Sequence, residues 1–141
     1  MSRSALETVG SFISAINGQD LLTLRTLMSA EHVFVDARGT RYCGADVMLE
    51  NWKQFFYAYP QYWISIDSNF ADGNRVALFG TVGGKWRVDG IVLPGSWRVT
   101  AAWLAEVEYG KIRRWSVFCD TTCATPPQLP MESVALTAAV V

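Results

Sequence analysis

The sequence predicts one domain of the α+β class, with helices in its first part and an antiparallel sheet in its second. Two patterns support this prediction. Apolar residues recur at helical spacing in three segments before residue 60, and from residue 61 they alternate in runs separated by turn signals. The 141 residues are half hydrophobic, so the chain can bury a core without disulfides or metals.

Three helices are expected in the first 60 residues. The first covers residues 6–16, where apolar side chains recur every three or four positions. A shorter helix follows over 21–28, with Asp20 as its N-terminal cap. The third occupies Gly44–Tyr59 and ends there, because a residue that precedes proline, here Pro60, disfavours the helical conformation.

The strands are expected mostly after the third helix. One short strand is predicted earlier, over residues 32–36. The remaining runs cover residues 61–70, 75–87, 97–107 and 111–120. Asp72-Gly73-Asn74 is a strong hairpin turn, and Pro94-Gly95 is expected to break the chain between strands. The glycine-rich segment 80–84 lies inside a strand, which favours a bend in the sheet over a phosphate-binding loop.

Composition limits the partners and the compartment. The net charge is −1 and the basic residues are scattered, so we expect no nucleic-acid partner. We expect no membrane partner either, because no apolar run is long enough to span a membrane. The three cysteines lack CxxC spacing and are interpreted as reduced thiols of a cytoplasmic protein. With a single histidine, no zinc or iron site has a plausible ligand set, and no cofactor is expected.

The domain is expected to cover residues 1–123. Beyond Cys123 the pattern gives way to a proline-rich segment and an Ala/Val-rich tail over 124–141. We interpret this tail as disordered or as lying on a partner.

Several short motifs resemble the NTF2-like superfamily. They are Ala-Ile-Asn-Gly-Gln-Asp-Leu at 15–21, His-Val-Phe-Val-Asp at 32–36 and Tyr-x-Gly at 42–44. The segment 115–120, Trp-Ser-Val-Phe-Cys-Asp, is similar to the Trp-x-x-Tyr-Phe-Asp strand of SnoaL-like polyketide cyclases and limonene-epoxide hydrolases. The resemblance covers about residues 6–120. It implies three helices closing a strongly curved sheet around a conical pocket, and a homodimer that forms through the sheet.

Three side chains are candidates for proton transfer. Asp120 ends an aromatic strand and matches the acid of the resembling motif; alternatively it caps the following turn in solvent. Asp36 falls where ketosteroid isomerases of the superfamily place their base, although a carboxylate there can equally cap the turn at 37–39. His32 shares a strand face with Asp36 and could orient it or act as a base, or it could be a polar edge residue.

Comparison with the related enzymes leaves gaps in each known site. Phe12 stands where an isomerase of this superfamily has a tyrosine donor, and by offset the second donor acid falls near Ala102. Arg98 resembles the arginine of the hydrolase Arg-x-Asp pair, but Thr100 replaces the acid. Alternatively, Arg98 is a surface residue that pairs with a carboxylate on a neighbouring strand. A cyclase requires least, namely one well-placed acid and a flat apolar slot.

Aromatic side chains are the candidates for such a slot. Trp52, Phe55, Trp103 and Trp115 could form its walls, and Tyr42 could place its hydroxyl at the mouth; each is also compatible with an ordinary core or edge position. Two functions remain open. One is a small enzyme that carries out acid–base chemistry on an apolar ring compound as a cyclase, isomerase or hydrolase. The other is a non-catalytic module that binds a hydrophobic ligand or dimerises.

Overall fold

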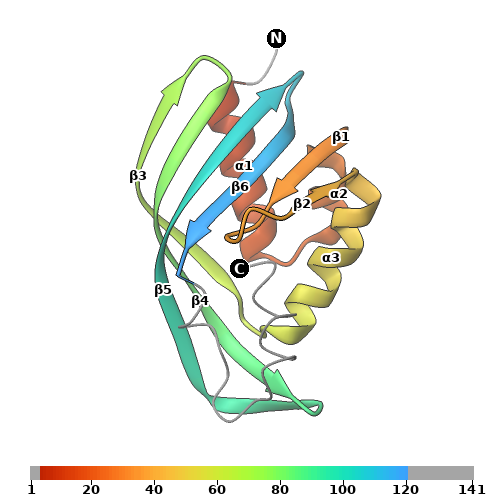
Figure 1. Cartoon of the computed structure of the whole chain (residues 1–141), viewed down its shortest axis with the longest axis vertical. Helices are drawn as coiled ribbons and strands as arrows, with labels where there is room; N and C mark the ends of the chain where they lie inside the picture. Colours follow the sequence, from red (N-terminus) through yellow and green to blue (C-terminus); the bar gives the residue numbers. More distant parts are fainter. Residues whose placement is uncertain (1–3, 121–141) are drawn as a thin grey trace.

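The computed structural model describes residues 4–120 and has the predicted α+β architecture (Figure 1). Its helices are α1 (Ala5–Asn17), α2 (Leu21–Leu27) and α3 (Ala45–Ala58). Its strands are β1 (Met28–Val35), β2 (Arg41–Cys43), β3 (Trp63–Asp72), β4 (Arg75–Val88), β5 (Ile91–Glu108) and β6 (Lys111–Cys119). The predicted domain end at 123 and the tail at 124–141 lie outside the described residues.

The helix ends follow local signals in the sequence. The Asp20 side chain accepts a hydrogen bond from the Thr23 amide, which confirms it as the cap of α2. The last residue of α3 precedes Tyr59 and Pro60, as expected. Met28 is a correction, because it begins β1 instead of ending α2.

The six strands of the described region form one sheet in the order β2-β1-β6-β5-β4-β3. All neighbours are antiparallel except β1 and β6, which pair in parallel. The predicted sheet was antiparallel throughout, and this pair is the exception. Strand β2 was not predicted, because three residues are too few to show alternation.

Glycines allow the sheet to curve strongly (Figure 1). A side chain at Gly80 would collide with the Ser65 carbonyl of β3, beside the register shift between Ile66 and Ser68. The bend predicted for segment 80–84 is therefore confirmed. The predicted break at Pro94-Gly95 is wrong, since β5 continues through it and only the pairing with β4 shifts there.

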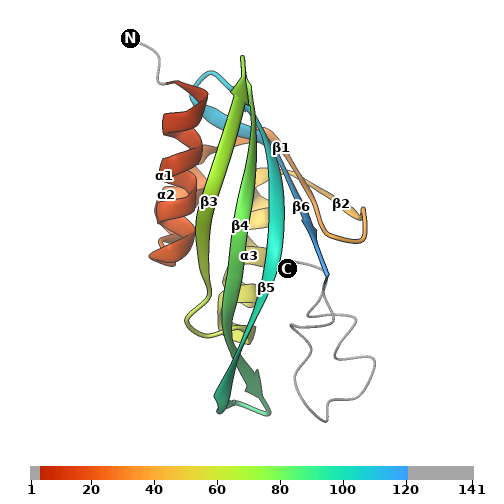
Figure 2. The same cartoon turned by 90° about the vertical axis from the view of Figure 1, so that its left-hand side faces the viewer.

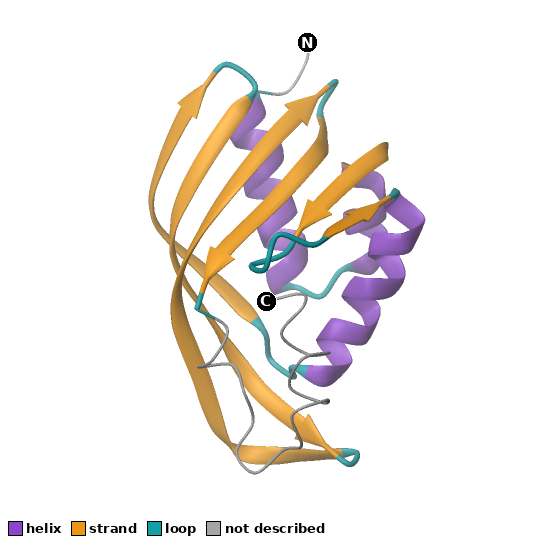
Figure 3. Ribbon diagram, viewed as in Figure 1, coloured by secondary structure: helices purple, strands orange, loops and turns teal. Residues whose placement is uncertain are grey.

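The core lies between the inner face of the curved sheet and the helices (Figure 3). Helix α1 packs on β3–β6. Helix α3 packs on β1 and β2, and it lies behind the strands in the view of Figure 2. Along β5, Trp97, Val99 and Trp103 are buried while Arg98 and Thr100 are exposed. None of the helices described is long and apolar enough to cross a membrane.

Candidate functional site

His32 is a buried base in the interior of the fold. Its side chain is fully buried, at the irregular stretch where the register of β1 and β6 shifts. The Nδ1 atom lies 2.7 Å from the Ile112 carbonyl oxygen. Because a carbonyl only accepts, Nδ1 carries the proton and Nε2 keeps its lone pair. Burial lowers the pKa of His32, and the hydrogen bond to Ile112 only partly opposes this, so the imidazole is held neutral.

Phe12 lies at the centre of an aromatic cluster that includes this histidine. Its ring centroid lies 4.9 Å from that of Trp115, 6.4 Å from that of Trp52 and 6.3 Å from that of His32. Phe55 joins the cluster through Trp52, at 5.9 Å. Four elements, α1, α3, β1 and β6, therefore bring together five of the residues selected from the sequence. We call Phe12, His32, Trp52 and Trp115 the inner cluster.

Polar atoms of the inner cluster lack partners. The structure describes six buried side-chain nitrogen or oxygen atoms without a hydrogen bond, and three of them are His32 Nε2, Trp52 Nε1 and Trp115 Nε1. A fourth, Thr8 Oγ1, lies one turn before Phe12 on α1. Each such atom costs about 1–3 kcal/mol when it is buried without a partner. Three of the six belong to side chains that pack on the Phe12 ring, which marks this region as a candidate site.

Asp36 is also buried, but its carboxylate is occupied. Oδ1 accepts hydrogen bonds from the backbone amides of Arg38 and Thr40, both at 2.9 Å. Oδ2 accepts one from the Tyr42 hydroxyl at 3.3 Å, and burial followed by the Asp36 charge raises the pKa of Tyr42. The Tyr42 ring lies 6.2 Å from that of Phe34. This is the arrangement of a carboxylate that stabilises a turn.

The other predicted residues lie in different places. Trp103 is buried on the inner face of β5. Arg98 is exposed on the opposite face of the same strand, so the structure does not bring it to the inner cluster. Asp120 is exposed and directly follows the last residue of β6, Cys119. Burial, with a smaller contribution from the Asp120 charge, raises the pKa of the Cys119 thiol to about 11.

Two tyrosines near the end of α3 were missed in the sequence. Tyr59 and Tyr62 are buried, and their rings lie 4.8 and 4.6 Å from that of Phe55. Burial raises the pKa of Tyr62, followed by the influence of Cys119 and Tyr59. The sequence did contain a signal for them. Both tyrosines lie close to Pro60 in a predicted loop, and a loop at the surface does not need large aromatic rings, so these rings could have been expected to pack inside. They extend the aromatic interior from Phe55 toward Cys119.

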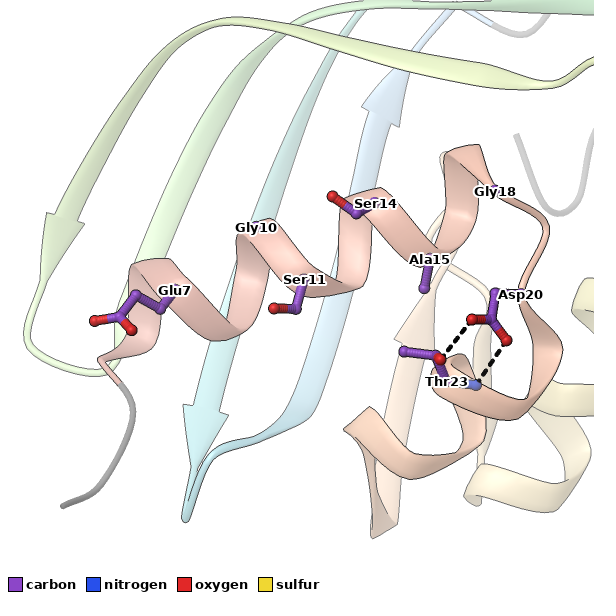
Figure 4. Close-up of a pocket in the computed structure, with 8 residues that line it drawn as sticks. All are labelled: Glu7, Gly10, Ser11, Ser14, Ala15, Gly18, Asp20 and Thr23. Carbon is purple, nitrogen blue, oxygen red and sulfur yellow. Dashed lines mark hydrogen bonds between the residues drawn. The ribbon is translucent and has the colours of Figure 1, made fainter.

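Two surface hollows lie along α1. A wide one of about 800 Å³ lies between α1 and α2 (Figure 4). Its Asp20 is engaged with Thr23, whose hydrogen bonds lower the pKa of that carboxyl. A narrower groove of about 360 Å³ separates α1 from β3 and is lined mostly by apolar side chains such as Ile13 and Ile66. Neither hollow gathers groups suited to proton transfer.

The described residues contain no cluster of three or more histidine, cysteine or acidic side chains that could hold a metal ion. The inner cluster instead contains one unpartnered lone pair, on His32, and two unpartnered N–H donors, on Trp52 and Trp115. By residue type, such a set has one group that can accept a proton and two that can donate a hydrogen bond.

Comparisons with known proteins agree with this architecture. The sequence profile of the SnoaL-like domain matches residues 9–115. No significant match was found among curated protein sequences. The fold is similar to a candidate SnoaL-like polyketide cyclase from Shewanella denitrificans OS-217, with a TM-score of 0.76, 14% identity, and coverage of 85% of this chain and 93% of that one.

Two further solved structures share the fold. An LEH-like epoxide hydrolase from M. tuberculosis has a TM-score of 0.73 at 19% identity, covering 86% of this chain and 82% of that one. A protein with a ketosteroid isomerase-like fold from Catenulispora acidiphila DSM 44928, solved in complex with trimethylamine, has a TM-score of 0.69 at 19% identity, covering 96% and 94%.

Proposed function

Because the chain belongs to the SnoaL-like domain family, we propose that it is a cofactor-independent enzyme that performs acid–base chemistry on an apolar ring compound. The family resemblance leaves cyclase, isomerase and hydrolase activities open. The observation that carries the proposal is His32, a fully buried imidazole with an unpartnered Nε2 beside the Phe12 ring. An imidazole whose Nε2 lone pair is unprotonated and unpartnered can act as a general base.

The proposed chemistry is the transfer of one proton. Nε2 of His32 accepts a proton from a C–H bond of the bound ring, and the electron pair of that bond moves into the ring system. The imidazolium then returns the proton to the substrate, so the protein is regenerated without a cofactor. The hydrogen bond from Nδ1 to the Ile112 carbonyl fixes the ring orientation and stabilises the charged form while it exists.

Asp120 and Asp36 have different roles in this proposal. Asp120 is proposed as a second proton carrier, acting at the end of β6 beside the Tyr62 and Cys119 region. Asp36 is proposed to act through structure, since both of its oxygens are engaged by the turn and by Tyr42. Phe55 and Trp103 are proposed to hold the apolar skeleton of the ligand.

The test is a conversion screen with matched variants. Wild-type protein is incubated with polycyclic ketones, anthraquinones and terpene epoxides, and conversion is measured by mass spectrometry. His32→Asn keeps a donor for the Ile112 carbonyl but removes the base, so it should lower the rate at least about 100-fold. Asp120→Asn should lower it as well, whereas Asp67→Asn, an exposed carboxylate of β3, should not.

Other outcomes would contradict the proposal. A compound that stabilises wild type and His32→Asn alike and is never converted would indicate a binding module. Conversion that survives in His32→Asn but is lost in Asp120→Asn would move the base to the end of β6.

We also propose a homodimer that forms through the outer face of the sheet. Phe79, Ala102 and Phe118 lie in register across β4, β5 and β6, and Phe70 packs on Phe79 at 6.1 Å. The three phenylalanines are exposed on this face, an apolar surface suited to a second copy. Sedimentation should give a dimer for wild type and a monomer for Phe79→Glu with Phe118→Glu. Tyr109→Glu, in an exposed turn, should remain dimeric, and a monomeric wild type would overturn the proposal.

A further inference from the structure

Strand β5 has an open edge beyond the end of β6. The pairing of these two strands ends at Ala101, which lies opposite Cys119, the last residue of β6. Strand β5 begins much earlier, at Ile91, and Figure 1 shows it continuing past the tip of β6. Residues 96–100 pair with β4 on one side only, since no other strand of the described region pairs with them. Their second edge can therefore accept one more strand.

The side chains along this edge alternate between two environments. Trp97 and Val99 are buried on the inner face of the sheet. Ser96, Arg98 and Thr100 are exposed on the outer face. A strand that pairs with this edge also turns successive side chains to opposite faces. Its inward side chains must be small or apolar enough to lie beside a tryptophan and a valine, while its outward side chains can be polar.

The chain that follows β6 has a sequence suited to these positions. Residues 121–125 are Thr-Thr-Cys-Ala-Thr, which include three of the β-branched side chains that favour strands. The pairing of β5 with β6 is regular where β6 ends, so each further residue of the chain faces one residue earlier on β5. In that register Thr121 faces Val99. Cys123 then faces Trp97, so both inward positions carry a small side chain.

Prolines mark the same end point on both strands. Pro126 follows the segment 121–125, and in the same register it faces Pro94 of β5. Neither residue has an N–H group to donate, so a ladder between the two strands cannot continue past this point. The open edge and the segment that matches it therefore end together.

We propose that residues 121–125 of this chain occupy the open edge of β5 as a continuation of β6, with Thr121 opposite Val99 and Cys123 opposite Trp97. The described region ends at residue 120, where the open edge begins, and residues 121–141 are more than enough to cover it. Since the segment is joined to β6 in the required register, no loop has to close. A second copy of the chain would have to give up its free translation and rotation to pair there. The added strand also removes an edge on which chains could aggregate.

The first test is a disulfide in register in the full-length chain. Arg98→Cys with Thr122→Cys places two thiols directly opposite each other on the outer face, within disulfide range. Arg98→Cys with Ala124→Cys is the matched control, because its second thiol is displaced by two residues along the strand. Both pairs also carry Cys43→Ser and Cys123→Ser, so that these native thiols do not compete. The pair in register should oxidise to an intramolecular disulfide at least about tenfold faster, as followed by peptide mass mapping.

The outcomes separate the possible occupants of the edge. Equal rates for the two pairs, or a faster disulfide in the control, would overturn the inference. A disulfide between two copies of the chain, visible as a dimer on a non-reducing gel, would assign the edge to a second copy and would also overturn it.

Hydrogen exchange tests the same pairing without new cysteines. The amides of residues 97–100 that point away from β4 should be protected in wild type. Thr121→Pro with Thr122→Pro removes two successive N–H groups, one of which points toward β5. Those β5 amides should then exchange at least about fivefold faster, the worth of one hydrogen bond. Val134→Pro with Ala135→Pro, later in the chain, should leave them unchanged. Exchange that is the same in wild type and in the threonine variant would refute the proposed pairing.

Discussion

The lowered pKa of His32 predicts that the protein loses stability in mild acid. The unfolded chain binds a proton at this side chain near pH 6.5, whereas the folded protein resists protonation because the imidazole is buried. Below pH 6.5 the unfolded state therefore holds more protons than the folded state, so the stability contribution present above that pH is lost as the pH falls. The loss continues until the folded-state pKa is reached.

The magnitude has an upper limit set by one proton. A single group changes the free energy of unfolding by at most about 1.4 kcal/mol per pH unit, so wild type can lose about 1.4 kcal/mol between pH 8 and pH 5.5 through His32. His32→Asn lacks this contribution but retains a donor for the Ile112 carbonyl. Since His32 is the chain's one histidine, no other imidazole obscures the comparison.

The assay is urea unfolding of both proteins at pH 5.5, 6.5, 7.5 and 8. The difference in unfolding free energy, wild type minus His32→Asn, should become less favourable to wild type as the pH falls below 6.5. A difference that stays constant over this range would show that the folded and unfolded states bind the proton equally. It would refute the description of His32 as a neutral buried base.

Two further predictions concern the turn and the sheet. Asp36→Ala removes the acceptor of two backbone amides and should lower the unfolding free energy by about 2–4 kcal/mol. Asp36→Asn should lower it less, and urea unfolding measures both variants. An Asp36→Ala variant as stable as wild type would exclude the turn role. Gly80→Ala should destabilise or unfold the protein because its Cβ meets the Ser65 carbonyl. Gly10→Ala, in the middle of α1 where a Cβ meets open space, should stabilise the protein by about 0.5–1 kcal/mol. Equal melting temperatures for the two variants would contradict this account.

Local signals were enough to predict most of the fold. Asp20 and Pro60 mark helix ends because capping and the conformational restriction before proline act within a few residues. The parallel pairing of β1 with β6 depends instead on contacts between residues about 80 positions apart, such as Val33 with Arg114. Nothing in either segment alone carries that information. The same holds for β2, which exists because it pairs with β1.

The candidate site was predictable in its residue types but less so in their roles. Alternation placed His32, Phe34 and Asp36 on one strand face, and all three are buried. The sequence could not distinguish a free carboxylate at Asp36 from one held by a turn, because this depends on where two amides point. Nor could it show that the acceptor for His32 Nδ1 is the distant Ile112 carbonyl.

The hydrogen-bond donors expected from the resemblance to the isomerases are absent from this chain. The sequence places Phe12 at the position of their tyrosine, and a phenyl ring cannot donate. Ala102, the position expected for the second donor, lies on the outer face beside Phe118. The structure instead surrounds Phe12 with two unpaired indole donors and an imidazole base. The absence of a donor at both positions therefore argues against the isomerase's residue set, and the fold alone does not supply it, since one fold hosts several chemistries.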